Sequence, residues 1–409
     1  MGASTVNSHA DSHDDVAYGS HIQSQGDVTI TATNGDLNVI GSQVHGQNVS
    51  LSASHDLNLL SQAEQHTQSQ SQANAGGEVG VSIGQTTGIY ATVNGGKGRT
   101  HGNGTTHLDT QIGADDTLNL FAGNDATIQG AQATGNTVLA DIGHDLHIAS
   151  EQDTNDYASN NWQGSVTVVY GFSGGGAGVS GSASAAQTDS KYKSVTQTSG
   201  IAAGDGGYDI SVGHHTDLTG GVIASTADPS RNLFSTGSLS YSDIQNEADY
   251  SAWSASVGGG YGTGNASNMS GFTPSGSIPQ GKSEHSVTHS GIAQGTVDIR
   301  DNPGQDLSGL DRNPDIDAQG LKTIFDAQKV AENQEAGQVA GYVGMRAAGD
   351  LEHKEGWKAG SGQATVTHAV VGAAVAALGG GNVLQGGGGR PVLPRVKPRR
   401  PIMRRQVPP

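Results

Sequence analysis

Three His–Asp pairs are the residues best suited to metal chemistry in this sequence: His13–Asp14, His55–Asp56 and His144–Asp145. Imidazole nitrogens and carboxylate oxygens are common metal ligands, but a bound ion needs three or four of them converging in space. His55 and His144 stand at the same place of a repeated motif, "SHDLNLL" and "GHDLHIA". A turn-forming role for the aspartates is therefore favoured over metal binding. We expect no metal and no cofactor.

A glycine-rich stretch, "GAGVSG" (Gly176, Gly178 and Gly181), has the spacing of a dinucleotide-binding loop and follows the strand-like "SVTVVYGF". Such a loop needs a helix directly after it, because the helix N-terminus holds the pyrophosphate. The next segment, "SASAAQTDSK", is a poor helix former, so glycines serving a flexible turn are favoured. No catalytic residue is nominated, and we predict that the chain is not an enzyme.

Three aromatic residues could bind sugars by stacking: Trp162, Trp253 and Tyr261. Aromatic residues in strands more often pack against neighbouring layers of a fold. We therefore expect these rings to pack between structural repeats, and the binding residues stay unknown.

The residue pattern of the segments between these candidates predicts short strands. Apolar residues alternate with polar ones at residues 28–32, 37–39, 49–53 and 57–59, and Gly, Asn or Asp turns separate them. The pattern returns at an offset of 89 residues, from His55 to His144 and from Leu57 to Leu146. A sandwich of hairpins would show similar alternation. Turns that repeat with the same apolar register favour coils stacked in parallel.

A second motif class repeats between these blocks. "NNWQGSVTVVYG" returns as "AWSASVGGGYG", and Trp162 precedes Trp253 by 91 residues. The unit is thus about 90 residues, which would hold three or four coils of about 20 to 30 residues each. Each coil buries its apolar face only against its neighbours, so stability comes from stacking.

The composition agrees with a repetitive β-structure. Glycine accounts for 64 of the 409 residues, and aromatics for only 4%. The net charge of −18 argues against nucleic acid as a partner, since phosphate binding needs a cationic face. The chain has no cysteine and so forms no disulfide. No apolar run is long enough to span a membrane as a helix.

The segments "GSQVHGQNVSLSASHDLNLLSQ" and "HSGIAQGTVDIRDNPGQDLSGLDRNPDIDAQGLKTIFDAQKVAENQE" resemble the hemagglutinin-repeat region of filamentous-hemagglutinin-like exoproteins. These include the exoproteins of contact-dependent growth inhibition, which are exported by two-partner secretion. The resemblance covers roughly residues 20–385. It implies an all-β fold, a right-handed parallel β-helix with β-strand insertions, on the surface of a Gram-negative cell.

The resemblance also implies partners. The full-length parent would use an outer-membrane two-partner secretion transporter and would contact the surface of a target cell. The first 20 residues lack a basic region and an apolar core, so no signal peptide is predicted. The family's transport domain and its C-terminal toxin are not found in the sequence either, which suggests a fragment of a secreted or cell-surface protein.

The C-terminal part changes its pattern. Residues 311–352 and the Ala/Gly-rich residues 353–385 show helical periodicity. Residues 386–409 are rich in Pro and Arg, and two explanations stand beside each other. This segment forms a basic arm for anionic lipid or nucleic acid, or, as we favour, it is translated out of frame.

The predicted organisation is therefore an N-terminal partial coil or disordered segment (1–22), a hemagglutinin-repeat β-helix (23–310), two helical segments and a disordered basic tail. The predicted function is a non-enzymatic, monomeric filament segment that serves target-cell contact and delivery of a C-terminal toxin. The alternative is an adhesin that binds surface glycans or receptors directly. A third hypothesis is a polysaccharide-processing β-helix enzyme.

Overall fold

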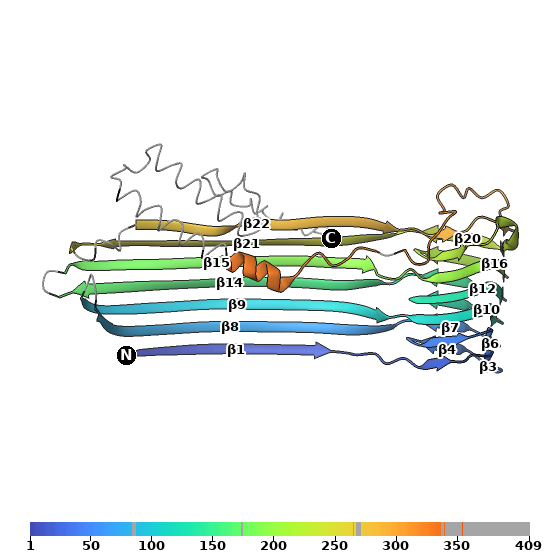
Figure 1. Ribbon diagram of the computed structural model, residues 1–409, viewed down its shortest axis with the longest axis horizontal. Helices are drawn as coiled ribbons and strands as arrows, with labels where there is room; N and C mark the ends of the chain where they lie inside the picture. Colours follow the sequence, from blue (N-terminus) through green and yellow to red (C-terminus); the bar gives the residue numbers. More distant parts are fainter. Residues whose placement is uncertain are drawn as a thin grey trace, which may run out of the picture.

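The computed structural model of the chain describes residues 1–83, 87–172, 175–264, 266, 271–318, 320–336, 339 and 354. Within them the chain is almost entirely β-structure, which confirms the all-β prediction. Figure 1 shows a stack of short strands at one end and a broad sheet of long strands that projects from it. We call these two parts the coil stack and the blade.

The coil stack consists of three rows of parallel strands. Two rows belong to an 11-stranded sheet, and the third is a six-stranded sheet. The 11-stranded sheet contains β2 (His21–Gln23), β3 (Val28–Ala32), β5 (Gln43–Gly46), β6 (Val49–Ala53), β10 (Thr110–Ala122), β12 (Ala131–Ile142), β16 (Gly200–Val212), β18 (Val222–Ser225), β19 (Asn232–Thr236), β23 (Gly291–Ile292) and β24 (Thr296–Ile299). The third row contains β4 (Leu37–Ile40), β7 (Leu57–Leu60), β11 (Ala126–Gln129), β13 (Leu146–Ala149), β17 (His215–Thr219) and β20 (Ser238–Ser242).

One coil takes a strand segment from each row, as β5, β6 and β7 do in the second coil. The first row, β2-β5-β10-β12-β16-β18-β23, has one strand per coil and gives seven coils among the described residues. Neighbouring coils pair in parallel and in register, so that Leu57 lies opposite Ala126 and Ala126 opposite Leu146. The four strands predicted near residues 28, 37, 49 and 57 are β3, β4, β6 and β7.

The blade is a seven-stranded antiparallel sheet in the order β1-β8-β9-β14-β15-β21-β22. Its strands are β1 (Gly2–Asp14), β8 (Gln62–Ser82), β9 (Gly88–Leu108), β14 (Gln152–Gly171), β15 (Ala177–Val195), β21 (Ile244–Gly262) and β22 (Gly271–Thr288). The chain leaves the stack after every second coil, runs out and back as a hairpin, and re-enters beside its exit. Its two strands must therefore run in opposite directions.

The sequence repeat follows from this path. Leu57, Ala126 and Leu146 are equivalent positions of three successive coils, separated by 69 and then 20 residues, which together give the offset of 89. A unit is thus two coils and one hairpin, and the expectation of three or four coils per unit is wrong. Each unit adds two coils and two blade strands, so both parts grow by the same number of strand spacings.

Glycines mark the coil junctions that carry no hairpin. Gly41, Gly130 and Gly220 have φ angles of 55°, 57° and 55°, in the left-handed region that side chains disfavour. The junctions that lead into the second and third hairpins carry Ser150 and Asp243 instead. Replacement of the junction glycine therefore accompanies an insertion.

The core runs along the inside of the coil stack. The inward positions of each strand are filled by Val, Ile, Leu and Ala, as in "VSLSA" of β6, where Val49, Leu51 and Ala53 are fully buried. Equivalent side chains of successive coils lie over one another, so every coil covers the apolar surface of the next.

The remaining elements are few. A short 3₁₀ helix, η1 (Pro229–Arg231), precedes β19, and residues 327–336, inside the predicted helical segment 311–352, form an α-helix. Residues 1–22, expected as a partial coil or disordered, supply β1 to the blade and begin the first coil with β2. The predicted helix at 353–385, apart from residue 354, and the basic tail at 386–409 lie outside the described residues. None of the described helical residues forms a helix long and apolar enough to cross a bilayer.

Candidate functional site

The repeated His–Asp motif lies at one corner of the coil stack, between the second and third strand rows. Asp36, Asp56, Asp125 and Asp145 occupy this corner in four successive coils, and we call them the aspartate ladder. Each Oδ1 atom accepts a hydrogen bond from a backbone N–H of the following coil. The donors are Asp56, Asp125, Asp145 and His215, at 3.2, 3.2, 3.0 and 2.9 Å. The ladder therefore ties five coils together along one edge.

The residue before each of the last three ladder aspartates, Asp56, Asp125 and Asp145, contacts the carboxylate of the preceding coil. Nδ1 of His55 lies 2.9 Å from Oδ1 of Asp36, and Nδ2 of Asn124 donates to Oδ1 of Asp56 at 2.8 Å. The hydrogen bond to Asp36 and the charge of Asp56 raise the pKa of His55. The Asn124 amide holds the pKa of Asp56 below its usual value. The sequence interpretation placed these aspartates in turns of their own coil, whereas the structure directs them to the next coil.

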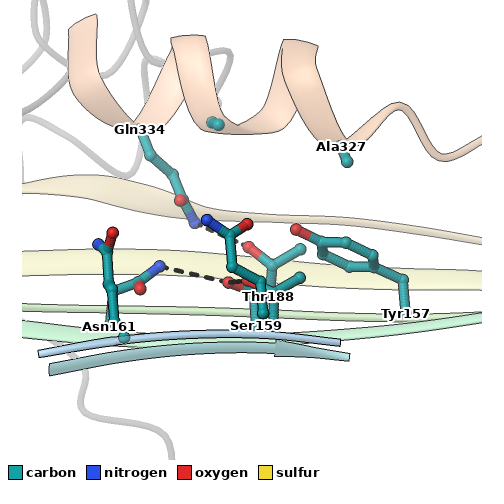
Figure 2. A pocket seen from close by; sticks show the side chains of 11 residues that line it. Tyr157, Ser159, Asn161, Thr188, Ala327 and Gln334 are labelled. Atoms are coloured by element: carbon teal, nitrogen blue, oxygen red, sulfur yellow. Dashed lines mark hydrogen bonds between the residues drawn. The ribbon is translucent and has the colours of Figure 1, made fainter. Parts of the chain in front are cut away.

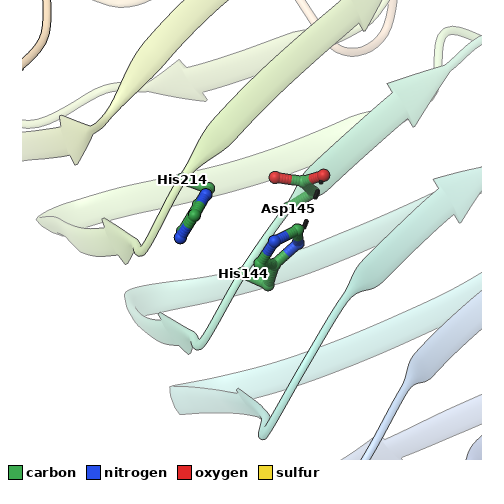
Figure 3. Close-up of side chains that lie close together, drawn as sticks. All are labelled: His144, Asp145 and His214. Carbon is green, nitrogen blue, oxygen red and sulfur yellow. Dashed lines mark ion pairs between the residues drawn. The ribbon is translucent and has the colours of Figure 1, made fainter.

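Two groups at this corner bring three possible metal ligands within 4.8 Å: Asp36, His55 and Asp56, and His144, Asp145 and His214. Figure 3 shows the second group, in which the two imidazole rings stack with their centroids 4.2 Å apart. Ring nitrogen lone pairs lie in the ring planes, so those of stacked rings do not converge on one ion. The corner as it stands serves cohesion between coils, and the absence of a metal remains a prediction.

Two other sequence candidates lie in the blade. His13 and Asp14 are the last two residues of β1, and Nδ1 of His66 lies 3.2 Å from Oδ1 of Asp14. Gly178 and Gly181 are within strand β15, and that strand is followed by coil strand β16 rather than by a helix. The nucleotide-binding interpretation therefore lacks the helix N-terminus that it requires.

A titratable cluster that sequence reasoning missed lies where the blade joins the coil stack. It contains His107, Asp109, Glu151 and Asp153. His107 donates its backbone N–H to Asp153 Oδ1 at 3.0 Å, and its Nδ1 atom lies 3.0 Å from the same oxygen. That bond raises the pKa of His107. Burial, reinforced by the charge of Asp153, raises the pKa of the Asp109 carboxyl to about 7.

We expect the substitution Asp109→Asn to stabilise the chain at pH 8 and to change little at pH 4. The pKa of Asp109 is raised from 3.8 to about 7 on folding, so folding opposes its ionisation. The resulting penalty grows from about pH 4 and is complete above about pH 7. A rise of this size corresponds to about 4 kcal/mol, and we expect about 2 kcal/mol because the side chain is partly exposed. Urea unfolding at both pH values measures it; equal effects at both would contradict the assignment.

One face of the blade, the one turned toward the viewer in Figure 1, is its near face. On this face the helix at 327–336 covers a polar hollow. Figure 2 shows Gln334 reaching down from the helix to the strands beside Thr188, Ser159 and Asn161. Its Nε2 atom donates to Thr188 Oγ1 at 3.3 Å and to the carbonyl of Trp253 at 3.2 Å. The hollow has a volume of about 230 Å³. Because an amide contacts backbone and hydroxyl groups there, this hollow attaches the helix to the blade.

The three aromatic candidates lie on β14 and β21 of the blade. The expectation that they pack between coils is therefore wrong. Trp162 is 54% exposed and Tyr261 is 68% exposed, and Trp253 is partly exposed. Aromatic side chains with this exposure are accessible to a partner.

Comparison with known proteins gives a consistent set of relatives. Residues 1–164 match the family model described as the hemagglutinin repeat. The chain is 37% identical over 366 residues to a tRNA nuclease CdiA of Escherichia coli O6:K15:H31 (strain 536 / UPEC), covering 84% of this chain and 11% of that protein. It is 34% identical over 365 residues to a deoxyribonuclease CdiA of Dickeya dadantii (strain 3937), covering 85% of this chain and 11% of that protein.

A deoxyribonuclease CdiA of Yersinia pseudotuberculosis serotype O:3 (strain YPIII) is 35% identical over 324 residues, which cover 77% of this chain and 30% of that protein. The chain thus spans 11% of the length of the first two relatives. No solved structure matches the chain.

Proposed function

Since this chain belongs to the hemagglutinin-repeat proteins related to CdiA, we propose that it is a non-enzymatic filament segment of a surface or secreted exoprotein. In the full-length protein the segment would hold the blade toward a target cell and support delivery of a C-terminal toxin. One observation carries this proposal: two coils and two blade strands are added by each repeat unit, so the fold gains length with every repeat.

The same stacking supports a finer fold assignment, a right-handed parallel β-helix over residues 23–310. Parallel strands of one sheet that are joined by a crossover connection are right-handed in about 98% of cases. A cryo-electron microscopy map that resolves side chains would determine the hand of the coils, and a left-handed path would contradict this assignment.

The remaining properties of the proposed function follow from the relationship and the charge. Export would use an outer-membrane two-partner secretion transporter, and the protein would stay on the surface of a Gram-negative cell or leave it. The net charge of −18 disfavours nucleic acid as a partner. The nuclease activities in the names of the relatives would belong to parts of those proteins outside the matched region.

A pair of deletions tests the filament proposal. The segment is placed in the corresponding region of a CdiA exoprotein, and growth inhibition of target cells is measured in coculture. Deleting residues 131–220 removes two coils and one hairpin, so that the third coil meets the sixth and β9 meets β21. We expect this variant to fold, to be displayed on the cell and to retain inhibition within a few-fold.

Deleting only the hairpin at residues 152–195 removes two blade strands but no coil. The stack is then taller than the blade by about 10 Å, or two strand spacings, and β9 can no longer pair with β21. We expect inhibition to fall to background at equal surface display. Loss of inhibition with both deletions, or with neither, would contradict a segment whose function depends on matched length.

The exposed aromatic face of the blade favours a second candidate function, an adhesin that binds glycans or receptors directly. Trp162 and Tyr261 are both on this face and both more than half exposed. Direct binding to cells by the isolated chain, without any toxin, would separate this function from delivery.

A further inference from the structure

The far face of the blade carries a hollow between two tryptophans and two cations. We call it the tryptophan hollow, and its volume is about 390 Å³, within the usual range of ligand sites. Its lining includes Lys97, Arg99, Asn160, Trp162, Ala185 and Trp253.

Strand register places these residues on one face. Trp162 of β14 lies opposite Lys97 of β9 and opposite Ala185 of β15. In the next row, two residues along, Asn160 lies opposite Arg99, and Gln187 lies opposite Trp253. Because side chains of a strand alternate between faces, residues two apart share a face. The small side chain of Ala185 leaves the space between the two indoles open.

The repeat explains why there are two tryptophans. Trp162 and Trp253 are separated by 91 residues and occupy the first strand of successive hairpins. They are two strands and two residues apart in the sheet, or about 12 Å from the strand and residue spacings. That separation suits a chain of several sugar rings better than a single small molecule.

The two cations are free to meet an anion. Lys97 and Arg99 are exposed, and within the described part of the chain neither forms an ion pair. They stand side by side in a protein whose net charge is −18. A paired ammonium and guanidinium on an acidic protein give the hollow a local positive charge, which favours carboxylate, sulfate or phosphate groups.

We propose that the tryptophan hollow binds an acidic oligosaccharide. The electron-rich face of an indole attracts the C–H groups of a sugar ring, while Lys97 and Arg99 pair with the anionic substituents. Asn160 supplies an amide for hydroxyl groups. This inference rests on the adhesin form of the proposed function and names the class of ligand for it.

Calorimetric titration of the full chain at low salt tests the inference. The probes are a hexasaccharide of galacturonic acid, a sulfated hexasaccharide, the neutral maltohexaose, and polyaspartate as a charged chain without sugar rings. We expect at least one acidic hexasaccharide to bind at least tenfold more tightly than maltohexaose and polyaspartate. Binding should weaken as salt rises toward 0.15 M, where the Debye length is about 8 Å.

Two substitutions and two matched controls locate the site. Trp162→Ala and Lys97→Glu should each weaken binding about tenfold, a loss typical of a central contact residue. Tyr170→Ala removes a 63% exposed aromatic side chain from the same face of β14, eight residues from Trp162 and outside the lining of the hollow. Lys282→Glu reverses a charge on β22 that is paired with Glu284. Both controls should bind like the unchanged chain.

Several results would overturn the inference. These are no binding of either acidic hexasaccharide, equal binding of polyaspartate, and unchanged affinity in both Trp162→Ala and Lys97→Glu. The inference fails separately from the filament proposal, because the deletion experiment measures delivery in coculture. The adhesin form has its own test, binding of the isolated chain to cells. A chain that binds cells but binds neither acidic hexasaccharide overturns only the ligand assignment.

Discussion

Replacing Ile128 with alanine should lower the free energy of unfolding by about 3 to 4 kcal/mol. Ile128 is 2% exposed in the third strand row. It lies between Leu59 of one neighbouring coil and Ile148 of the other. Truncation opens a cavity that touches both neighbours, and the apolar core of the stack consists of such contacts between adjacent coils. Urea unfolding followed by circular dichroism measures the loss.

The matched control is the adjacent residue. Thr127 lies on the same strand with its side chain on the other face, and we expect Thr127→Ala to cost about 0.5 kcal/mol. If the two substitutions cost the same, the assignment of inside and outside along β11 is wrong, and the parallel register of this row fails with it.

Replacing Asp56 with alanine should cost about 2 kcal/mol at pH 7, because it leaves two donors of the next coil without their acceptor. Those donors are the backbone N–H of Asp125 and the side-chain amide of Asn124, at 3.2 and 2.8 Å. Asp56→Asn keeps an acceptor oxygen and should recover about half of the loss. Thermal and urea unfolding of the three proteins measure it.

The pH dependence of this effect has a definite sign. The pKa of Asp56 is lowered in the folded chain from its ordinary value of 3.8. Its contribution to stability is therefore present above pH 3.8 and is lost as the pH falls through the folded pKa. The difference between the unchanged chain and Asp56→Ala should shrink below about pH 4. Asp141→Ala, on an exposed position of β12, should stay within about 0.5 kcal/mol at every pH. A ladder effect that persists at pH 3 would contradict the hydrogen-bond account.

The short strands of the coil stack could be predicted from the sequence because their side chains alternate with a period of two. Val49, Leu51 and Ala53 point inward while the serines between them point outward. The parallel arrangement followed from turns that repeat in register, and the hemagglutinin-repeat assignment followed from the same residues. Local patterns sufficed because every coil buries one face of each short strand, so the same alternation of apolar and polar residues returns in each coil.

The blade could not be predicted with the same ease. Its strands, such as β8 with "QAEQHTQSQSQANAGGEVGVS", are largely polar and show no clear apolar face. They pair because the coil stack holds neighbouring hairpins one strand spacing apart. This pairing cannot be predicted from the residue pattern of the blade strands themselves. The aligned tryptophans were visible at an offset of 91 residues, but the two cations beside Trp162 come from β9, more than 60 positions earlier in the chain.

The hydrogen bonds between coils could not be predicted from the sequence either. The His–Asp repeat was found in the sequence, yet its carboxylates bond to a coil 20 or 69 residues away, from Asp36 to Asp56 and from Asp56 to Asp125. The cluster of His107, Asp109 and Asp153 joins residues from different hairpins. Such pairings depend on which hairpins separate the coils, and a single sequence without the fold gives no distance between them.

Spin-label distances along one strand row test the central claim, the in-register parallel stack, most directly. Asn38, Asn58, Thr127, His147, Asp217 and Ser240 are equivalent positions of six successive coils, and the chain has no cysteine to interfere with labelling. With one label at Asn38, separations to His147, Asp217 and Ser240 should be about 14, 19 and 24 Å, in even steps of one strand spacing. Even steps in this order would establish the stack. Distances that do not rise by equal steps, or that bring Ser240 closer to Asn38 than His147 is, would contradict it.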